Sequence, residues 1–150
     1  MKERFTSEEW EMLKTLPLIA FGVVASADGK IDQKEAAEMT KRLQSGAVGY
    51  KDPLHREVAA AILRSDLPTL IAAGKSVDPR SIKSFLQQKL TRDEYLSFMG
   101  SILIDMLAVA RASGGLFARS NVSDEESSVL AAFAALFEID IDAVKKIFGA

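Results

Sequence analysis

The sequence predicts an all-α fold, and three observations support this prediction. Apolar residues recur at helical spacing over long windows, while the alternation expected of strands is missing. Glycines follow several of the apolar runs, where a helix is expected to end. Possible capping boxes occur at Thr6 with Glu9, Asp32 with Glu35, Thr91 with Glu94, and Ser123 with Glu126. We therefore expect a single-domain bundle of seven to nine helices that spans residues 1–150.

Further start and stop residues divide the chain into these helices. Asp52-Pro53 and Asp78-Pro79 each place an N-cap residue before a proline at the first helical position. Pro17 either separates the first two segments or kinks one helix. Four glycines mark expected helix ends: Gly29, Gly46, Gly74 and Gly114. The expected helices lie near residues 7–14, 16–28, 33–45, 53–64, 67–73, 79–89, 92–112, 124–137 and 141–148.

Two segments are apolar nearly all round, namely "LPLIAFGVVASA" (16–27) and "SILIDMLAVARA" (101–112). A helix without a polar face is expected in the centre of a bundle, so we predict a buried central helix pair wrapped by amphipathic helices. Asp105 lies inside the second segment, and a buried carboxylate needs a partner. We expect that partner to be an arginine or His55. We expect His55 itself, in the first turn after Asp52-Pro53, to be an ordinary surface residue.

The two central segments also resemble each other. With a shift of 85 residues, "LIAFGVVASADG" (18–29) aligns with "LIDMLAVARASGG" (103–115). After six extra residues, "IDQKE" (31–35) aligns with "VSDEE" (122–126). We predict a duplicated helix–turn–helix unit, at approximately residues 16–45 and 101–137, packed with approximate two-fold symmetry.

Composition narrows the possible functions. The 19 basic residues are scattered among 21 acidic ones, and the net charge is −2, which argues against nucleic-acid binding. Without cysteine, the chain cannot form a thiolate nucleophile or an iron–sulfur site, and with one histidine it cannot form a site that needs two imidazoles. Nothing in the sequence places a serine beside an activating base. We therefore expect a protein that is not an enzyme.

The first residues, "MKERFTSEEWEMLK", contain no apolar core of a secretory leader. The longest apolar stretches, at residues 16–25 and 102–110, are shorter than a bilayer-spanning helix. The sequence accordingly predicts a cytoplasmic protein without direct membrane insertion.

The stretch "ASADGKIDQKE" (25–35) shares the second half of a calcium-binding loop. If Gly29 takes position 6 of that loop, Asp28, Asp32 and Glu35 fall on positions 5, 9 and 12. Position 1, which needs an Asp, is Val24, and it belongs to a helical run. A calcium hand of ordinary high affinity is therefore not expected.

Two interpretations of this stretch remain open. In the first, Gly29 ends one helix while Asp32 and Glu35 only cap the next. That leaves Asp28 unexplained, because a carboxylate in the last helical turn faces the negative end of the helix dipole. In the second interpretation, the carboxylates also bind Ca²⁺, Mg²⁺ or Mn²⁺, which prefer oxygen ligands. Their affinity for the cation would be weak, with a dissociation constant on the order of 10⁻⁴ M or poorer. The coordination shell of the ion would need further ligands: turn carbonyls, water, or acids from another segment such as Asp124, Glu125 and Glu126.

"VVASADGKIDQKEAAEM" resembles the N-terminal signature of TerB-like proteins, and "AVARASGG…VSDEESSVLAAFAALFEID" resembles the weaker second copy of that family. The resemblance implies an all-helical domain with metal-binding acidic turns, and roles in bacterial stress and tellurite resistance. Related modules occur in some DnaJ-type membrane co-chaperones. If the metal-binding positions of TerB-like proteins are transferred to the matching residues of this chain, the resemblance implies a metal site formed by Asp28, Asp32, Glu35 and Glu126. The chain departs from the pattern at Ser113, where an Asp is expected, and by the insertion "LFARSN".

Together these observations predict a non-enzymatic TerB-like helical protein that binds a divalent cation weakly through its acidic helix–turn–helix. The alternative is a pure protein–protein interaction module in which the acidic residues only cap helices. Because the chain has no cysteine, it cannot reduce tellurite with thiols, so any role in resistance must be binding, sensing or assembly. Both interpretations imply a protein partner, which the sequence does not identify, and leave a homodimer open.

Overall fold

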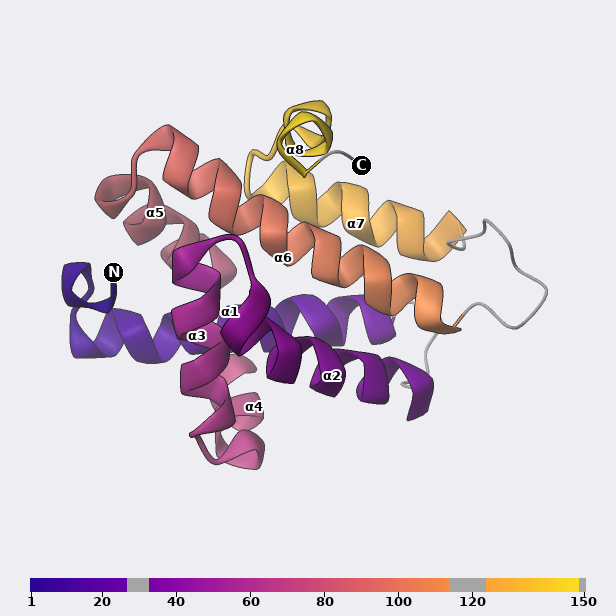
Figure 1. Cartoon of the computed structure of the whole chain (residues 1–150), viewed down its shortest axis with the longest axis horizontal. Helices are drawn as coiled ribbons and strands as arrows, with labels where there is room; N and C mark the ends of the chain where they lie inside the picture. Colours follow the sequence, from indigo (N-terminus) through magenta and orange to yellow (C-terminus); the bar gives the residue numbers. More distant parts are fainter. Residues whose placement is uncertain (27–32, 114–123, 149–150) are drawn as a thin grey trace.

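The computed structural model describes residues 1–26, 33–113 and 124–148, except for the side chains of residues 35, 113, 124–126, 145 and 147. Eight α-helices and no strand occur in this part of the chain, which confirms the all-α bundle (Figure 1). After a 3₁₀ turn at Lys2–Arg4, the helices are α1 (Ser7–Ala25), α2 (Gln33–Gly49), α3 (Pro53–Leu63), α4 (Leu67–Gly74), α5 (Pro79–Lys89), α6 (Arg92–Ser113), α7 (Asp124–Leu136) and α8 (Ile141–Phe148).

Helices α1 and α6 form the buried central pair that the sequence predicts. They pack against each other, and each also contacts most of the remaining helices. Leu13 and Leu16 of α1 and Phe98, Met99 and Ile102 of α6 are almost completely inaccessible to solvent. Helices α3, α4 and α5 pack on α1, whereas α2 and α8 pack on α6. The most apolar segments of the sequence thus occupy the centre, as expected from the hydrophobic effect.

The predicted repeat units correspond to the helix pairs α1–α2 and α6–α7. Helix α2 packs on α6, and helix α7 packs on both α1 and α6 (Figure 1). The second helix of each unit therefore contacts the first helix of the other unit. The duplication itself stays a prediction from the sequence.

Several helix starts follow the predicted capping chemistry. The Thr6 hydroxyl accepts a hydrogen bond from the Glu9 amide at 3.2 Å, and the Glu9 carboxylate accepts one from the Thr6 amide at 2.7 Å. Thr91 and Glu94 exchange the same pair of bonds at 3.3 and 2.9 Å. Asp52 and Asp78 cap α3 and α5, each before its proline. The predicted boxes at Asp32 and Ser123 and the predicted glycine stops at Gly29 and Gly114 lie outside the described residues.

The structure decides two of the predicted breaks. At Pro17 it has the one-helix alternative, since α1 runs through the proline from Ser7 to Ala25. Gly46 does not end α2, which continues to Gly49. The Tyr50 ring lies against the backbone of Gly46 so closely that a Cβ atom at residue 46 would overlap it. This glycine therefore permits a close approach within a continuous helix.

Helix α6 is the one described helix that is long and apolar enough to cross a membrane. Its span at Arg92–Ala112 has a mean hydropathy of 1.4, and 56% of it is buried against the rest of the protein. The central helix of a packed bundle meets the same criterion.

Candidate functional site

The predicted metal ligands lie outside the part of the chain that the structure describes. Asp28 and Asp32 belong to residues 27–32, and the side chains of Glu35 and Glu126 are not described. Among the described residues, no three His, Asp or Glu side chains are placed to share a metal ion. The metal site therefore stays a prediction from the sequence.

The helix before the acidic stretch is described, and it bears on the calcium-loop pattern. Val24 is a buried residue of α1 and is only 1% exposed. The helix ends at Ala25, where the Ser26 amide donates to the Gly22 carbonyl at 3.1 Å. A residue buried in a continuous helix cannot serve as the first ligand of a coordinating loop. The prediction that Val24 belongs to a helix is thus confirmed.

The structure places a cluster of polar groups where α2, α3 and α6 meet, with Asp105 at its centre. Arg42 Nη1 on α2 donates a hydrogen bond to Asp105 Oδ1 at 2.8 Å. The Tyr50 hydroxyl, from the turn between α2 and α3, donates to Asp105 Oδ2. His55 Nε2 on α3 lies 3.7 Å from the same oxygen. The prediction that a buried Asp105 would be partnered by an arginine or by His55 is confirmed.

The prediction of His55 as a surface residue is wrong, because its side chain is completely buried. Its Nδ1 lies 2.5 Å from Ser101 Oγ on α6. His55 shares its helix face with Val58, Ala59 and Ile62, which follow it at intervals of three, four and seven residues and are all buried. That spacing is visible in the sequence and indicates an inward-facing histidine.

Burial controls the protonation of this cluster. It lowers the pKa of His55 from 6.5 to about 3, so the imidazole is neutral near pH 7. Burial raises the pKa of the Asp105 carboxyl, while the hydrogen bonds from Tyr50 and Arg42 act in the opposite direction. Burial also raises the pKa of the Tyr50 hydroxyl, and the adjacent Asp105 charge raises it further. The imidazole thus adds no charge to the cluster near pH 7, where the Arg42 guanidinium faces Asp105 and also Glu38, whose Oε1 lies 3.1 Å from Arg42 Nε.

A second carboxylate, that of the buried Asp52, joins α3 to α6 near the half-buried Asp105. Asp52 Oδ1 accepts a hydrogen bond from the His55 amide at 2.8 Å and thereby caps α3. Its Oδ2 accepts another from the Ser97 hydroxyl of α6, also at 2.8 Å. The Arg42–Asp105 and Asp52–Ser97 contacts together hold α2 and α3 on α6.

Contrary to the expectation from the sequence, the fold does place a serine beside a histidine. Ser101, His55 and Asp105 come together, but they do not have the geometry of a hydrolytic triad. The 3.7 Å separation of His55 from Asp105 is too long for a hydrogen bond, and an imidazole with a pKa near 3 is a weak base. The amides around Ser101 lie within α6, where helical hydrogen bonds occupy them, so they cannot stabilise an oxyanion. The arrangement is that of a structural contact.

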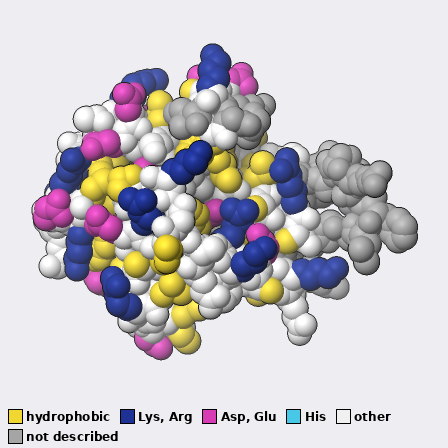
Figure 2. Space-filling view, viewed as in Figure 1, with side chains coloured by type: hydrophobic (Ala, Val, Ile, Leu, Met, Phe, Trp, Pro, Cys, Tyr) yellow, Lys and Arg dark blue, Asp and Glu magenta, His cyan; other side chains and the backbone are white. Residues whose placement is uncertain are grey.

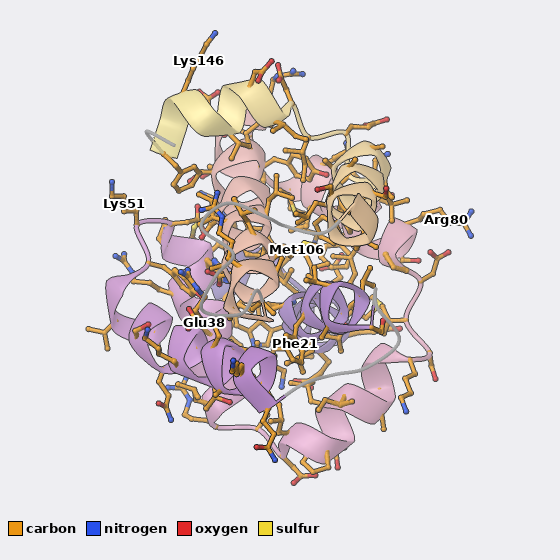
Figure 3. The ribbon with its side chains drawn as sticks, turned by 90° about the vertical axis from the view of Figure 1, so that its right-hand side faces the viewer. Phe21, Glu38, Lys51, Arg80, Met106 and Lys146 are labelled. Atoms are coloured by element: carbon orange, nitrogen blue, oxygen red, sulfur yellow. The ribbon has the colours of Figure 1, made fainter. Side chains whose placement is uncertain are left out.

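An open cleft borders this cluster, and a small internal cavity lies behind it. The cavity, of about 30 Å³, lies between α1, α2 and α6 and is lined by Phe21 and Met106, both labelled in Figure 3. Arg42 and Asp105 line both the cavity and the cleft. Their ion pair therefore lies between the interior and the surface.

No known protein family, curated protein or solved structure matches this chain. The resemblance to TerB-like proteins accordingly rests on the quoted sequence motifs.

Proposed function

We propose that this protein is a non-enzymatic helical binding module, in which the acidic stretch 28–35 binds a divalent cation weakly. The observation that carries the non-enzymatic part is the mutual bonding of the buried and half-buried polar groups where α2, α3 and α6 meet. Asp105 bonds to Arg42 and Tyr50, and Asp52 bonds to Ser97 and the α3 amide, so these groups connect helices.

The position of the acidic stretch supports the cation-binding part. Helix α1 ends at Ala25 and helix α2 begins at Gln33, so Asp28 and Asp32 fall in the sequence between two helices of the bundle. Carboxylates spaced along such a connection are suitable ligands for Ca²⁺, Mg²⁺ or Mn²⁺. By its resemblance to TerB-like proteins, we place the role in bacterial stress or tellurite resistance, through binding to a protein partner in the cytoplasm.

One observation favours the alternative, a protein–protein interaction module in which these acids only cap helices. Helices α2 and α7 begin directly after Asp32 and Ser123, which are the N-cap positions of the predicted boxes. The same spacing at Thr6–Glu9 and Thr91–Glu94 forms complete capping boxes in this chain. Capping alone would therefore account for Asp32 and Glu35.

Calorimetric titration with Ca²⁺, Mg²⁺ and Mn²⁺ separates the two functions. Asp28→Asn removes a carboxylate that capping does not need, and Asp32→Asn removes a carboxylate but keeps a side chain that caps well. If the cation site exists, both variants lose binding heat without a lower melting temperature. Asp93→Asn, in the first turn of α6, is a matched control that should titrate like the wild type. No heat with any of the ions up to several millimolar would favour the interaction module.

A further inference from the structure

We propose that the cleft between the α2–α3 turn, α6 and α8 binds an anionic amphiphile, namely a carboxylate carried on an apolar chain. This site is separate from the acidic stretch and does not depend on cation binding there. Three features carry the proposal: the size of the cleft, its surplus of positive charge, and its continuity with an apolar hollow.

The cleft is large enough for a small organic ligand. Its volume is about 590 Å³, within the range of roughly 300–1,000 Å³ that is typical of small-molecule sites. Tyr50 and Ser101 line it beside the buried cluster, and Phe148 of α8 lines it as well. Helix α8 approaches α6 closely at Gly100, where a Cβ atom would lie 3.0 Å from the Phe148 ring.

Positive charge exceeds negative charge in this cleft. Arg42, Lys51 and Arg111 line it together with a single carboxylate, that of Asp105. Arg42 pairs with Asp105 and also with Glu38, which does not line the cleft. Lys51 and Arg111 are exposed and form no hydrogen bond or ion pair with any side chain in the described ranges. Arg56 adds a fourth cation at the turn, where its Nη1 donates to the Tyr50 carbonyl at 3.1 Å. Among the described residues, the cleft therefore offers two cations without a side-chain partner to an anion.

The figures show how these cations are presented. Figure 2 shows Lys and Arg side chains spread over the face seen in Figure 1, and several of them lie over α2 and α6. In Figure 3, Lys51 points outward from the α2–α3 turn on the same side of the molecule as α8, and Arg80 lies at the opposite edge. A carboxylate that enters from solvent can therefore reach Lys51 directly.

An apolar hollow of about 300 Å³ between α6, α7 and α8 continues the cleft. Ile104, Leu107 and Arg111 line both spaces, so Arg111 lies at their junction. Leu130 and Ile141 supply the apolar walls beyond that junction, and Ile141 is 38% exposed. A ligand with its charge at the cleft and its chain in the hollow would satisfy both surfaces, because the buried chain gains roughly fourfold in affinity per CH₂.

Binding of dodecanoate to the full-length protein, measured by calorimetry and by amide chemical shifts, tests this proposal. We expect dodecanoate to bind, octanoate to bind at least tenfold more weakly, and dodecyltrimethylammonium to show no binding. We expect Lys51→Gln combined with Arg111→Gln to weaken dodecanoate binding by about tenfold or more, with an unchanged circular dichroism spectrum. Lys75→Gln removes an exposed cation directly after α4, which does not line the cleft, and should bind like the wild type.

Four outcomes would overturn the proposal. Dodecanol binding as tightly as dodecanoate would show that the charged head is not recognised. Undiminished binding by the double variant would place the ligand elsewhere. No binding of dodecanoate up to about 1 mM would exclude the site for this ligand class. Shifts induced by phosphatidylglycerol vesicles but not by monomeric dodecanoate would assign the surface to a membrane instead of a free amphiphile.

Discussion

The ring of Tyr50 lies flat on the imidazole of His55, with the ring centroids 3.8 Å apart and the planes at 9°. Tyr50 belongs to the turn after α2, and His55 belongs to the first turn of α3. The stack covers one face of the imidazole and directs the Tyr50 hydroxyl to Asp105 of α6. The Tyr50 side chain thereby joins the turn after α2 to α3 and α6. The first three predictions concern Tyr50 or His55.

Gly46→Ala should destabilise the protein. Alanine in a helix is ordinarily favoured over glycine by up to about 1 kcal/mol. At residue 46, however, the new Cβ would overlap the Tyr50 ring and push it away from His55 and Asp105. Overpacking of this kind costs roughly 1–3 kcal/mol, so we expect a net loss of about 1 kcal/mol or more in the free energy of unfolding, measured in urea.

Gly49→Ala is the matched control for this variant. Gly49 ends the same helix, and a Cβ atom there would meet nothing within 4 Å. We expect this variant to be neutral or slightly stabilised. Equal effects of the two substitutions would show that the Tyr50 ring does not depend on the absence of a side chain at residue 46.

Tyr50→Phe should cost more stability than Tyr95→Phe. The Tyr50 hydroxyl donates to the Asp105 carboxylate, whereas the Tyr95 hydroxyl donates to the Phe137 carbonyl at 2.6 Å. Hydrogen bonds to charged groups contribute about 1.5–3 kcal/mol and those between neutral groups about 1 kcal/mol. We expect urea unfolding to give this order, with both variants folded. The reverse order would indicate that Asp105 carries no charge in the native protein.

Stability should fall as the pH falls below about 6.5, because of His55. The pKa of this imidazole is about 3 in the folded protein and near 6.5 in the unfolded chain. Between these values the unfolded chain binds the additional proton, so acid favours unfolding by up to about 1.4 kcal/mol per pH unit. Asp52 and Asp105, whose pKa values burial raises, act in the opposite direction, at the lower pH where carboxyls titrate.

Nuclear magnetic resonance can follow this proton directly, since His55 is the single histidine of the chain. We expect its ring signals to stay unchanged from pH 7.5 to about pH 5 in the folded protein. A titration midpoint near pH 6.5 in the native state would contradict the prediction that burial lowers the pKa of His55. It would mean that Asp105, 3.7 Å from Nε2, stabilises the protonated ring as much as burial opposes it.

Gly22→Ala should stabilise the protein. Gly22 lies within α1, and a Cβ atom there would meet nothing within 4 Å. Alanine lowers the conformational entropy of the unfolded chain and favours the helix, by about 0.5–1 kcal/mol. Thermal unfolding should show a higher melting temperature by a few degrees. A lower melting temperature would indicate that α1 needs a glycine at this position.

Local sequence patterns predict much of this fold. The caps at Thr6, Asp52, Asp78 and Thr91 depend on residues within a few positions of each other, and all four form. The apolar periodicity likewise predicts the central pair, because a helix without a polar face can bury its surface only inside the bundle. Gly46 fails as a helix stop for a nonlocal reason: its missing side chain makes room for an aromatic ring.

In the candidate site, too, local sequence predicts some features and nonlocal packing decides the others. That Asp105 must have a partner follows from the sequence alone, because an unpaired carboxylate in an apolar helix is unfavourable. Which partners it has was decided by the packing of α2 and α3 on α6, which brings Arg42 and Tyr50 to it over 63 and 55 positions of sequence. The same packing buried His55 and left Lys51 and Arg111 together at one cleft. The sequence by itself determined the helices and their apolar faces, since these depend on local spacing. Only the tertiary structure decided which polar groups meet, since that depends on how the helices cross.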